Sequence, residues 1–262
     1  GTPITLRAAK GMPVSQREVT TDHFTARAQR YNRSSHWCTD PILMDKLMAM
    51  LEPGPGTRVL DVACGTGLVS RVFTAQGAEV TGLDITEAMY DQARPHLQEL
   101  VVSPAEDMPF EDGVFDISFC RQGIQFMNGP GAVQEMVRVT RPGGRICLVH
   151  LTAYGEEDKE EYFEVLRLRN PARKNFYLRT DLEALLSEAG CEQVVVHSHV
   201  SPEDVDAWSD NGAIPEEARE GIRRVYRQAS PTFQELHAVA TGVDGRFTDH
   251  MLFGIAIGVC PH

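Results

Sequence analysis

A glycine-rich turn between Asp61 and Gly67 carries the residues whose types and spacing are best suited to binding a ligand. The segment Asp61-Val62-Ala63-Cys64-Gly65-Thr66-Gly67 follows a short apolar run and precedes a helical pattern that begins at Leu68. Glycines let the backbone approach a ligand closely, and the N-terminus of the following helix offers free N–H groups to a carboxylate. Because a GxG pattern also occurs in plain turns, its neighbours must decide what it binds.

Two carboxylates distinguish between the ligands that such a turn could hold. Asp84 ends the next apolar segment, 17 residues after Gly67, close to the spacing of an acid that holds ribose hydroxyls. Asp61 precedes the glycines, where its charge would repel a pyrophosphate and attract an ammonium group. Ser70 replaces the third glycine of the dinucleotide pattern GxGxxG. These residues favour S-adenosylmethionine (SAM), which has an ammonium, over a dinucleotide; the alternative for Asp61 is a cap of the turn alone.

The elements around this turn predict an α/β fold. Strand and helix patterns alternate with short Gly-rich turns, which is typical of a doubly wound, mostly parallel sheet. The chain is long enough for one large domain. Strands are predicted at 58–63, 79–85, 99–103, 114–120, 145–151, 192–200 and 249–260, and helices at 68–76, 86–97, 132–140 and 180–190.

The predicted organisation is an N-terminal arm with cap helices over residues 1–55, followed by one binding domain over residues 56–262. The cap helices begin after Thr21-Asp22 and after Asp40-Pro41. The alternation of strands and helices is interrupted by two segments, at about 152–176 and 202–247. The second is mostly helical and separates the last two strands, and it is too long for a simple turn. We expect both segments to be lids over a pocket.

Composition excludes several classes of function. A net charge of -12 disfavours nucleic acid, because binding its phosphates requires Lys and Arg. No apolar run reaches the ~20 residues of a membrane span, and no signal peptide pattern is present, so we expect a cytoplasmic protein. The six cysteines are scattered singly, without metal-ligand spacing, which predicts reduced, buried thiols and no metal site. The oligomeric state is left open.

The order of these motifs resembles the class I SAM-dependent methyltransferases, particularly the branch of ubiquinone and menaquinone biosynthesis. The resemblance covers residues 57–151. Besides the glycine-rich turn it includes Ser103–Phe110 after the third strand, Phe115–Arg121 on the fourth strand and Arg141–Arg145 before the fifth. It implies a seven-stranded Rossmann-like sheet in which Asp249–Cys260 is a late antiparallel strand, and it implies methyl transfer from SAM.

The resemblance also implies a set of cofactor contacts. The glycines would pass under the methionine part, the Asp84 carboxylate would hold the ribose diol, and an aromatic side chain, Tyr31, would close the site unless it is a core residue. Pro104 replaces the usual Asp or Asn acceptor for the adenine amino group, so Glu106 or Asp107 would have to substitute. The full predicted set is Tyr31, Asp61, Ala63, Gly65, Thr66, Gly67, Asp84, Ile85, Met89, Ala105, Glu106 and Cys120.

The methyl acceptor should lie beyond the ends of strands four and five, where ligands of open α/β sheets bind. His150 could be a general base or a hydrogen-bonded structural residue. Arg121 could fix an anionic group or pair with a lid carboxylate. The other predicted acceptor contacts are Gln122, Gln125, Phe126 and Tyr154, whereas two basic clusters, Arg167-Arg169-Arg173-Lys174 and Arg223-Arg224-Arg227, are predicted to be solvated faces.

The predicted function is methylation of a small molecule, with the O, C, S or N acceptor atom left open. No Asn-Pro-Pro-Tyr-type run follows the fourth strand, which disfavours amide nitrogen. Two alternatives come from other classes: a nicotinamide-dependent oxidoreductase, and a SAM-binding module without catalysis.

Overall fold

The computed structural model of the chain describes residues 3–6, 40–86 and 90–262. The helix predicted from Thr21, and the cofactor contacts predicted for Tyr31 and Met89, lie outside these residues. Cys38 lies outside them as well. The five described cysteines are all free and buried, as expected.

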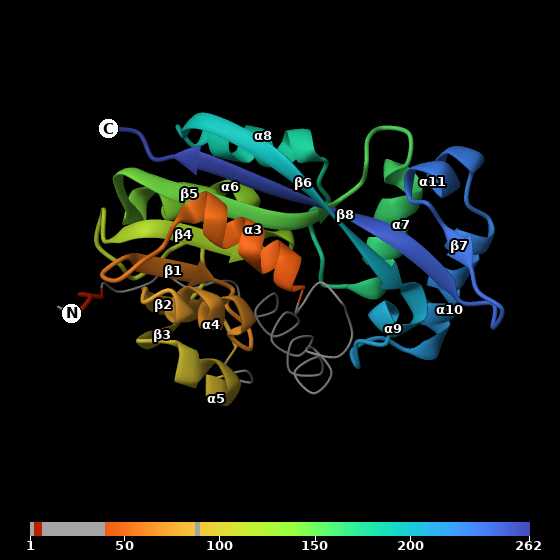
Figure 1. Cartoon of the computed structure of the whole chain (residues 1–262), viewed down its shortest axis with the longest axis horizontal. Coiled ribbons are helices and arrows are strands. Elements are labelled where there is room, and N and C mark those ends of the chain that lie inside the picture. Colours follow the sequence, from red (N-terminus) through yellow and green to blue (C-terminus); the bar gives the residue numbers. More distant parts are fainter. Residues whose placement is uncertain (1–2, 7–39, 87–89) are drawn as a thin grey trace.

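One sheet runs through the centre of the molecule (Figure 1). Its strands are β1 (Arg58–Val62), β2 (Glu79–Asp84), β3 (Glu99–Val102), β4 (Phe115–Arg121), β5 (Thr140–Thr152), β6 (Glu192–Asp204), β7 (Ala240–Thr241) and β8 (Phe247–Val259). The order is β3-β2-β1-β4-β5-β8-β6, and β7 pairs with β8 off this path. Neighbours from β1 to β5 pair in parallel, whereas β8 is antiparallel to β5 and β6. The predicted mostly parallel sheet with a late antiparallel strand is confirmed; β7 has no counterpart in the prediction.

Helices cover both faces of the sheet, because the strand residues alternate between two apolar layers. Val59 and Phe119 belong to the layer that includes residues of α3 (Pro41–Leu51) and α4 (Leu68–Ala75). Leu60 and Leu148 belong to the layer that includes residues of α6 (Gly129–Val139) and α8 (Arg179–Glu188). The predicted helix at 86–97 contains a described helical turn, α5 (Tyr90–Ala93), and a 3-10 turn. The sheet is therefore doubly wound, as predicted.

Capping side chains set where two of these helices begin. The Asp40 carboxylate accepts the N–H of Ile42 at 2.9 Å, and a proline follows in the first turn of α3. The Asn128 side chain accepts the N–H of Gly131 at 3.0 Å. Because of this cap, α6 begins at Gly129, three residues earlier than predicted.

A helical group lies beyond one end of the sheet, where the long strands β6 and β8 extend (Figure 1). Its helices are α7 (Lys159–Arg169), α9 (Val205–Ser209), α10 (Glu216–Arg227) and α11 (Pro231–Leu236). Tyr162, Trp208, Ile222 and Phe233 are buried in it and join the apolar layer of α3 and α4. The segment 202–247 is thus mostly helical, as predicted, and it shares a core with the sheet. Its role as a lid stays a prediction.

A buried ionic network fastens this helical group to β8. His237 lies between two carboxylates, with Nε2 2.7 Å from Asp158 and Nδ1 2.8 Å from Asp249. The Tyr226 hydroxyl donates to Asp249 as well. Burial alone lowers the pKa of His237, but the hydrogen bonds to both carboxylates outweigh it and raise the pKa to about 9. The network therefore holds a charged imidazole at neutral pH.

Among residues 3–6, 40–86 and 90–262, no helix is long and apolar enough to cross a membrane. The same residues contain no group of three or more His, Cys, Asp or Glu side chains arranged to hold a metal ion. The cytoplasmic location stays a prediction.

The His237 network predicts a stability that falls at alkaline pH. A folded-state pKa of about 9, above the ordinary 6.5, contributes stability that is fully present below pH ~6.5 and is lost as the pH rises through about 9. We expect the free energy of unfolding to fall by on the order of 3 kcal/mol over this range. Urea denaturation at a series of pH values measures it. His237→Gln should remove the dependence, and the exposed-site control His197→Gln should retain it; an unchanged slope in His237→Gln would contradict the prediction.

Candidate active site

The glycine-rich turn leaves β1 through a series of left-handed backbone conformations. Ala63, Gly65 and Gly67 have φ values of 58°, 54° and 81°. The N–H of Ala63 donates to the carbonyl of Leu83 at 2.7 Å, which ties the turn to β2. A Cβ atom at Gly67 would lie 3.0 Å from the Cα atom of Ala93. Glycine is therefore required at Gly67 by both its conformation and its packing.

Asp84 lies at the end of β2 and organises this turn. One of its carboxylate oxygens accepts the N–H of Gly65 at 3.0 Å, and the other accepts the N–H of Thr86 at 3.1 Å. Burial raises the pKa of Asp84, and the backbone hydrogen bonds partly offset this effect. The carboxylate thus spans the ends of β1 and β2, the position predicted for a ribose-binding acid.

Asp61 is a second buried carboxylate, near the end of β1. It is 3% exposed, and the Ser70 hydroxyl donates to it at 2.5 Å. Burial raises its pKa to about 6; the hydrogen bond from Ser70 and the charge of Arg121 lower it, whereas the charge of Asp84 raises it. In the sequence, Ser70 is notable only because it replaces the third glycine of GxGxxG. In the structure it lies in the first turn of α4 and is the hydrogen-bond partner of Asp61.

The turn after β4 lies against the glycine-rich turn. A Cβ atom at Gly123 would lie 2.6 Å from the Cβ atom of Ala63 and 2.9 Å from the sulfur of Cys120. Gln122 has a φ of 51°, so the residues after β1 and β4, Ala63 and Gln122, are both left-handed without being glycine. Such conformations cost energy and cluster at functional sites. Sequence patterns gave no signal for either of them.

The segment after β3 contains the residues predicted to meet adenine. Ala105 is buried, at 1% exposure. Glu106 accepts the N–H of Asn128 through Oε1 at 3.0 Å, and its Oε2 is buried without a hydrogen-bond partner among the described residues. A buried carboxylate oxygen with an open lone pair can accept a hydrogen bond from an amino group. Glu106 therefore suits the acceptor role that Pro104 cannot fill.

His150 lies on β5, on the layer side that faces Tyr177. It is fully buried, its ring centroid is 5.8 Å from that of Tyr177, and neither ring nitrogen has a hydrogen-bond partner in the described part of the chain. Burial, together with the charge of Arg173, holds the pKa of His150 well below its ordinary value. The imidazole is neutral at physiological pH and can accept one hydrogen bond and donate another.

The other residues predicted to meet the acceptor have different surroundings. Gln122 accepts the N–H of Leu151 at 2.7 Å and so joins β4 to β5. The side chains of Gln125 and Phe126, in a 3-10 turn after β4, are 2% exposed. The Tyr154 hydroxyl instead donates to the carbonyl of His250 at 2.6 Å, on the side of the helical group. Their contacts with an acceptor stay predictions.

One of the basic clusters differs from its prediction as a solvated face. Arg169 and Arg173 are 2% and 7% exposed, because the loop after α7 folds inward over the end of β4. The carbonyl of Gln125 accepts the N–H groups of Lys174 and Asn175 at 2.8 and 3.1 Å, which fixes this loop. The cluster on α10 does match its prediction and pairs with glutamates on its own helix.

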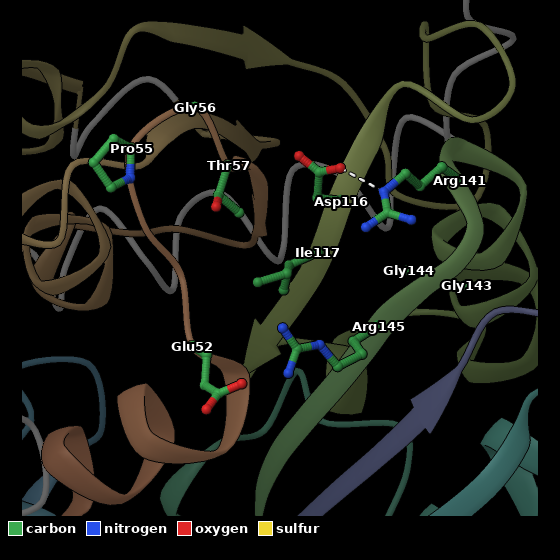
Figure 2. Close-up of a pocket in the computed structure, with 10 residues that line it drawn as sticks. All are labelled: Glu52, Pro55, Gly56, Thr57, Asp116, Ile117, Arg141, Gly143, Gly144 and Arg145. Carbon is green, nitrogen blue, oxygen red and sulfur yellow. Dashed lines mark hydrogen bonds and ion pairs between the residues drawn. The ribbon is translucent and has the colours of Figure 1, made fainter.

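A separate pocket opens at the opposite, amino end of the strands (Figure 2). Its volume is about 420 Å³. Arg141 donates to Asp116 at 2.6 Å, and Arg145 donates to the backbone carbonyls of Met50 and Leu51. Since its arginines are held by the protein itself, we assign this pocket a structural role.

Comparison with known proteins supports a methyltransferase. Residues 60–148 match the family model described as "Methyltransferase domain". The malonyl-[acyl-carrier protein] O-methyltransferase of Serratia marcescens is 37% identical over 112 residues, which are 42% of this chain and 44% of that protein. The chain thus matches less than half the length of this relative.

Solved structures show the same fold. A methyltransferase structure from Bacillus halodurans has a TM-score of 0.76 at 23% identity and covers 84% of this chain and 99% of that one. A phosphoethanolamine N-methyltransferase of Haemonchus contortus, in complex with S-adenosylhomocysteine, has a TM-score of 0.60 at 18% identity and covers 95% of this chain and 61% of that one. The described chain has the fold of these structures, and its residues 60–148 are similar to the methyltransferase domain.

Proposed function

We propose that the protein transfers the methyl group of SAM to a small-molecule acceptor. The observation that carries this proposal is the pair of buried carboxylates, Asp61 and Asp84, on either side of a left-handed glycine turn. A pyrophosphate would place negative charge beside both of them, whereas SAM offers an ammonium to one and a ribose diol to the other. This arrangement disfavours the nicotinamide-dependent alternative, and no observation favours a module without catalysis.

The described residues suit each part of SAM. Asp61 would accept from the ammonium, Asp84 would accept from the ribose hydroxyls, and Glu106 would accept from the adenine amino group. Gly65 and Gly67 would let the backbone pass close to the methionine part. By the family resemblance, Ile85 and Met89 would pack near the adenosine and Tyr31 would close the site. The narrower resemblance to the ubiquinone and menaquinone branch stays a prediction.

His150 suits a positioning role better than proton removal from an alcohol. SAM supplies an activated methyl group, which departs with breaking of its carbon–sulfur bond. An imidazole whose pKa lies well below its ordinary value is a weak base. Acceptors that are already nucleophilic, such as a carboxylate, a thiolate or a stabilised carbanion, need no such base. The Serratia marcescens relative is named for O-methylation, which supports oxygen as the acceptor atom.

The assignment of Asp84 predicts a loss of SAM affinity in Asp84→Ala. We expect calorimetry to show that SAM and S-adenosylhomocysteine bind the wild type and NAD does not, and that the variant binds SAM at least ~1.4 kcal/mol, or about tenfold, more weakly. Glu79→Ala, at the other end of β2, is the matched control and should bind normally. NAD binding without SAM binding would refute the proposed function, and an unchanged affinity in Asp84→Ala would refute the ribose assignment.

The assignment of Asp61 predicts that SAM binds more weakly in acid. Its pKa of about 6 means that the carboxylate which attracts the ammonium is mostly ionised at pH 7 and mostly protonated at pH 5. We expect the affinity for SAM to fall by about tenfold between these pH values. Asp61→Asn should bind weakly at both. A full pH response in Asp61→Asn would show that another group is responsible.

The assignment of His150 predicts a weak effect of its replacement on turnover. If the neutral imidazole only positions the acceptor, His150→Gln should lower kcat by less than the ~10²–10⁴-fold expected for loss of a general base. The kcat of the wild type should be flat between about pH 6.5 and 8.5. Release of S-adenosylhomocysteine with saturating acceptor measures both. A larger loss together with an ionisation near neutral pH would restore the general-base role.

A further inference from the structure

Arg173 lies on the loop that follows α7, and its charged end is buried. The side chain is 7% exposed, and Nε donates to the carbonyl of Asn175 at 2.8 Å. The two terminal nitrogens, Nη1 and Nη2, are buried and have no hydrogen-bond partner in the described part of the chain. Two donors of a permanent cation are thus withdrawn from water without replacement.

The groups that act electrostatically on this guanidinium do not include a carboxylate. They are the phenols of Tyr162 and Tyr177, and burial lowers the pKa of Arg173 to about 10. His150 also responds to the charge of Arg173. A buried cation that lacks an anionic partner is destabilising for the folded protein. An anion from outside the described residues would offset this cost.

Two neighbouring arginines on α7, Arg167 and Arg169, have partners within the protein and serve as a comparison. Arg169 is also buried, but its Nε donates to the carbonyl of Trp208 at 3.0 Å and its guanidinium lies 4.3 Å from the centre of the Trp208 ring. Arg167 and Arg173 lie 5.0 and 5.1 Å from the Phe176 ring. Arg167 is exposed and paired with Glu164. Arg173 differs from both because its two terminal nitrogens are buried without a hydrogen-bond partner among the described residues.

Further buried polar atoms of this region have no hydrogen-bond partner among residues 3–6, 40–86 and 90–262. They are both ring nitrogens of His150, the side-chain oxygen of Gln125 and the hydroxyl of Tyr162. The Gln125 backbone binds the loop that carries Arg173. Tyr162 belongs to one apolar layer and Tyr177 to the other, so Arg173 lies where the two layers meet beyond the ends of β4 and β5.

This region is also connected to the cofactor residues. The Tyr177 phenol interacts electrostatically with both Arg173 and Cys120, and the Cys120 thiol interacts in turn with Asp61 and Asp84. The unsatisfied polar groups therefore lie on the acceptor side of the candidate SAM site.

The geometry points to Arg173 as the anchor of a carboxylate on the methyl acceptor, with Tyr162, His150 and Gln125 as hydrogen-bonding neighbours. The inference rests on the proposed methyl transfer and names its substrate class. A guanidinium presents two parallel N–H donors that match the two oxygens of a carboxylate. A phosphate would bring a second charge, and the only cation among these groups is Arg173, since His150 is neutral.

Binding of small acids to the full chain loaded with S-adenosylhomocysteine tests this inference. Hexanoate, benzoate and malonate are titrated by calorimetry beside their neutral amides and beside inorganic phosphate. We expect at least one acid to bind tenfold or more tightly than its amide. Arg173→Met should reduce that acid to the affinity of the amide, whereas the control Arg167→Met should retain it. Equal binding of acid and amide, tighter binding of phosphate, absence of acid binding, or acid binding retained by Arg173→Met would each overturn the inference.

Thermal unfolding separates a ligand anchor from a structural arginine. Loss of an unpartnered buried cation should raise the Tm of Arg173→Met without ligand by about 2–4 °C, and the acid should raise the Tm of the wild type only. A lower Tm in Arg173→Met would show a structural role and overturn the inference. If SAM does not bind, the proposed function is refuted. The acids are then titrated against the chain without S-adenosylhomocysteine, which tests the role of Arg173 independently.

Discussion

The hydrogen bond from the Gly65 N–H to the Asp84 carboxylate is the contact on which the candidate site depends. It joins the turn after β1 to the end of β2, and the left-handed conformations of Ala63 and Gly67 bring the backbone to that point. The same turn begins α4, whose Ser70 returns a hydrogen bond to Asp61. One carboxylate thus fixes the loop that would receive the methionine part and faces the space that would receive the ribose.

Much of this arrangement could be predicted from the sequence because its signals are local. Apolar runs and glycine turns predicted β1, β2 and β4, and the spacing of Asp84 from the glycines predicted that its carboxylate lies beside the glycine-rich turn, which the hydrogen bond from the Gly65 N–H confirms. The left-handed conformations of Ala63 and Gln122 could not be predicted, since nothing in those residue types requires them. Neither could the burial of Arg173, because the loop after α7 turns inward only through backbone contacts with Gln125, a residue distant in the sequence.

Two buried charges near the helical group, on His237 and on Arg173, have different surroundings. At His237, two carboxylates bind both ring nitrogens of the imidazole, a tyrosine donates to one of those carboxylates, and the helical group is held to β8 as part of the core. Arg173 lies a few residues after α7, and its cation lacks a protein anion among the described residues. A satisfied network holds structure in place, whereas buried polar atoms without partners support the acceptor position proposed above. No sequence motif indicates this difference.

The position of β8 between β5 and β6 has a consequence for how the chain reaches its native state. β8 pairs with residues of β5 that precede it by about one hundred positions. One edge of β5 therefore pairs only after a strand close to the end of the sequence has reached it. Closing so long a loop is entropically costly, and non-local pairing slows folding. Until β8 is in place, one edge of β5 is unpaired and β6 lacks its neighbouring strand. Unpaired strand edges are prone to associate with other chains. The helices α9, α10 and α11, which lie between β6 and β8, lengthen the loop that must close before the sheet is complete.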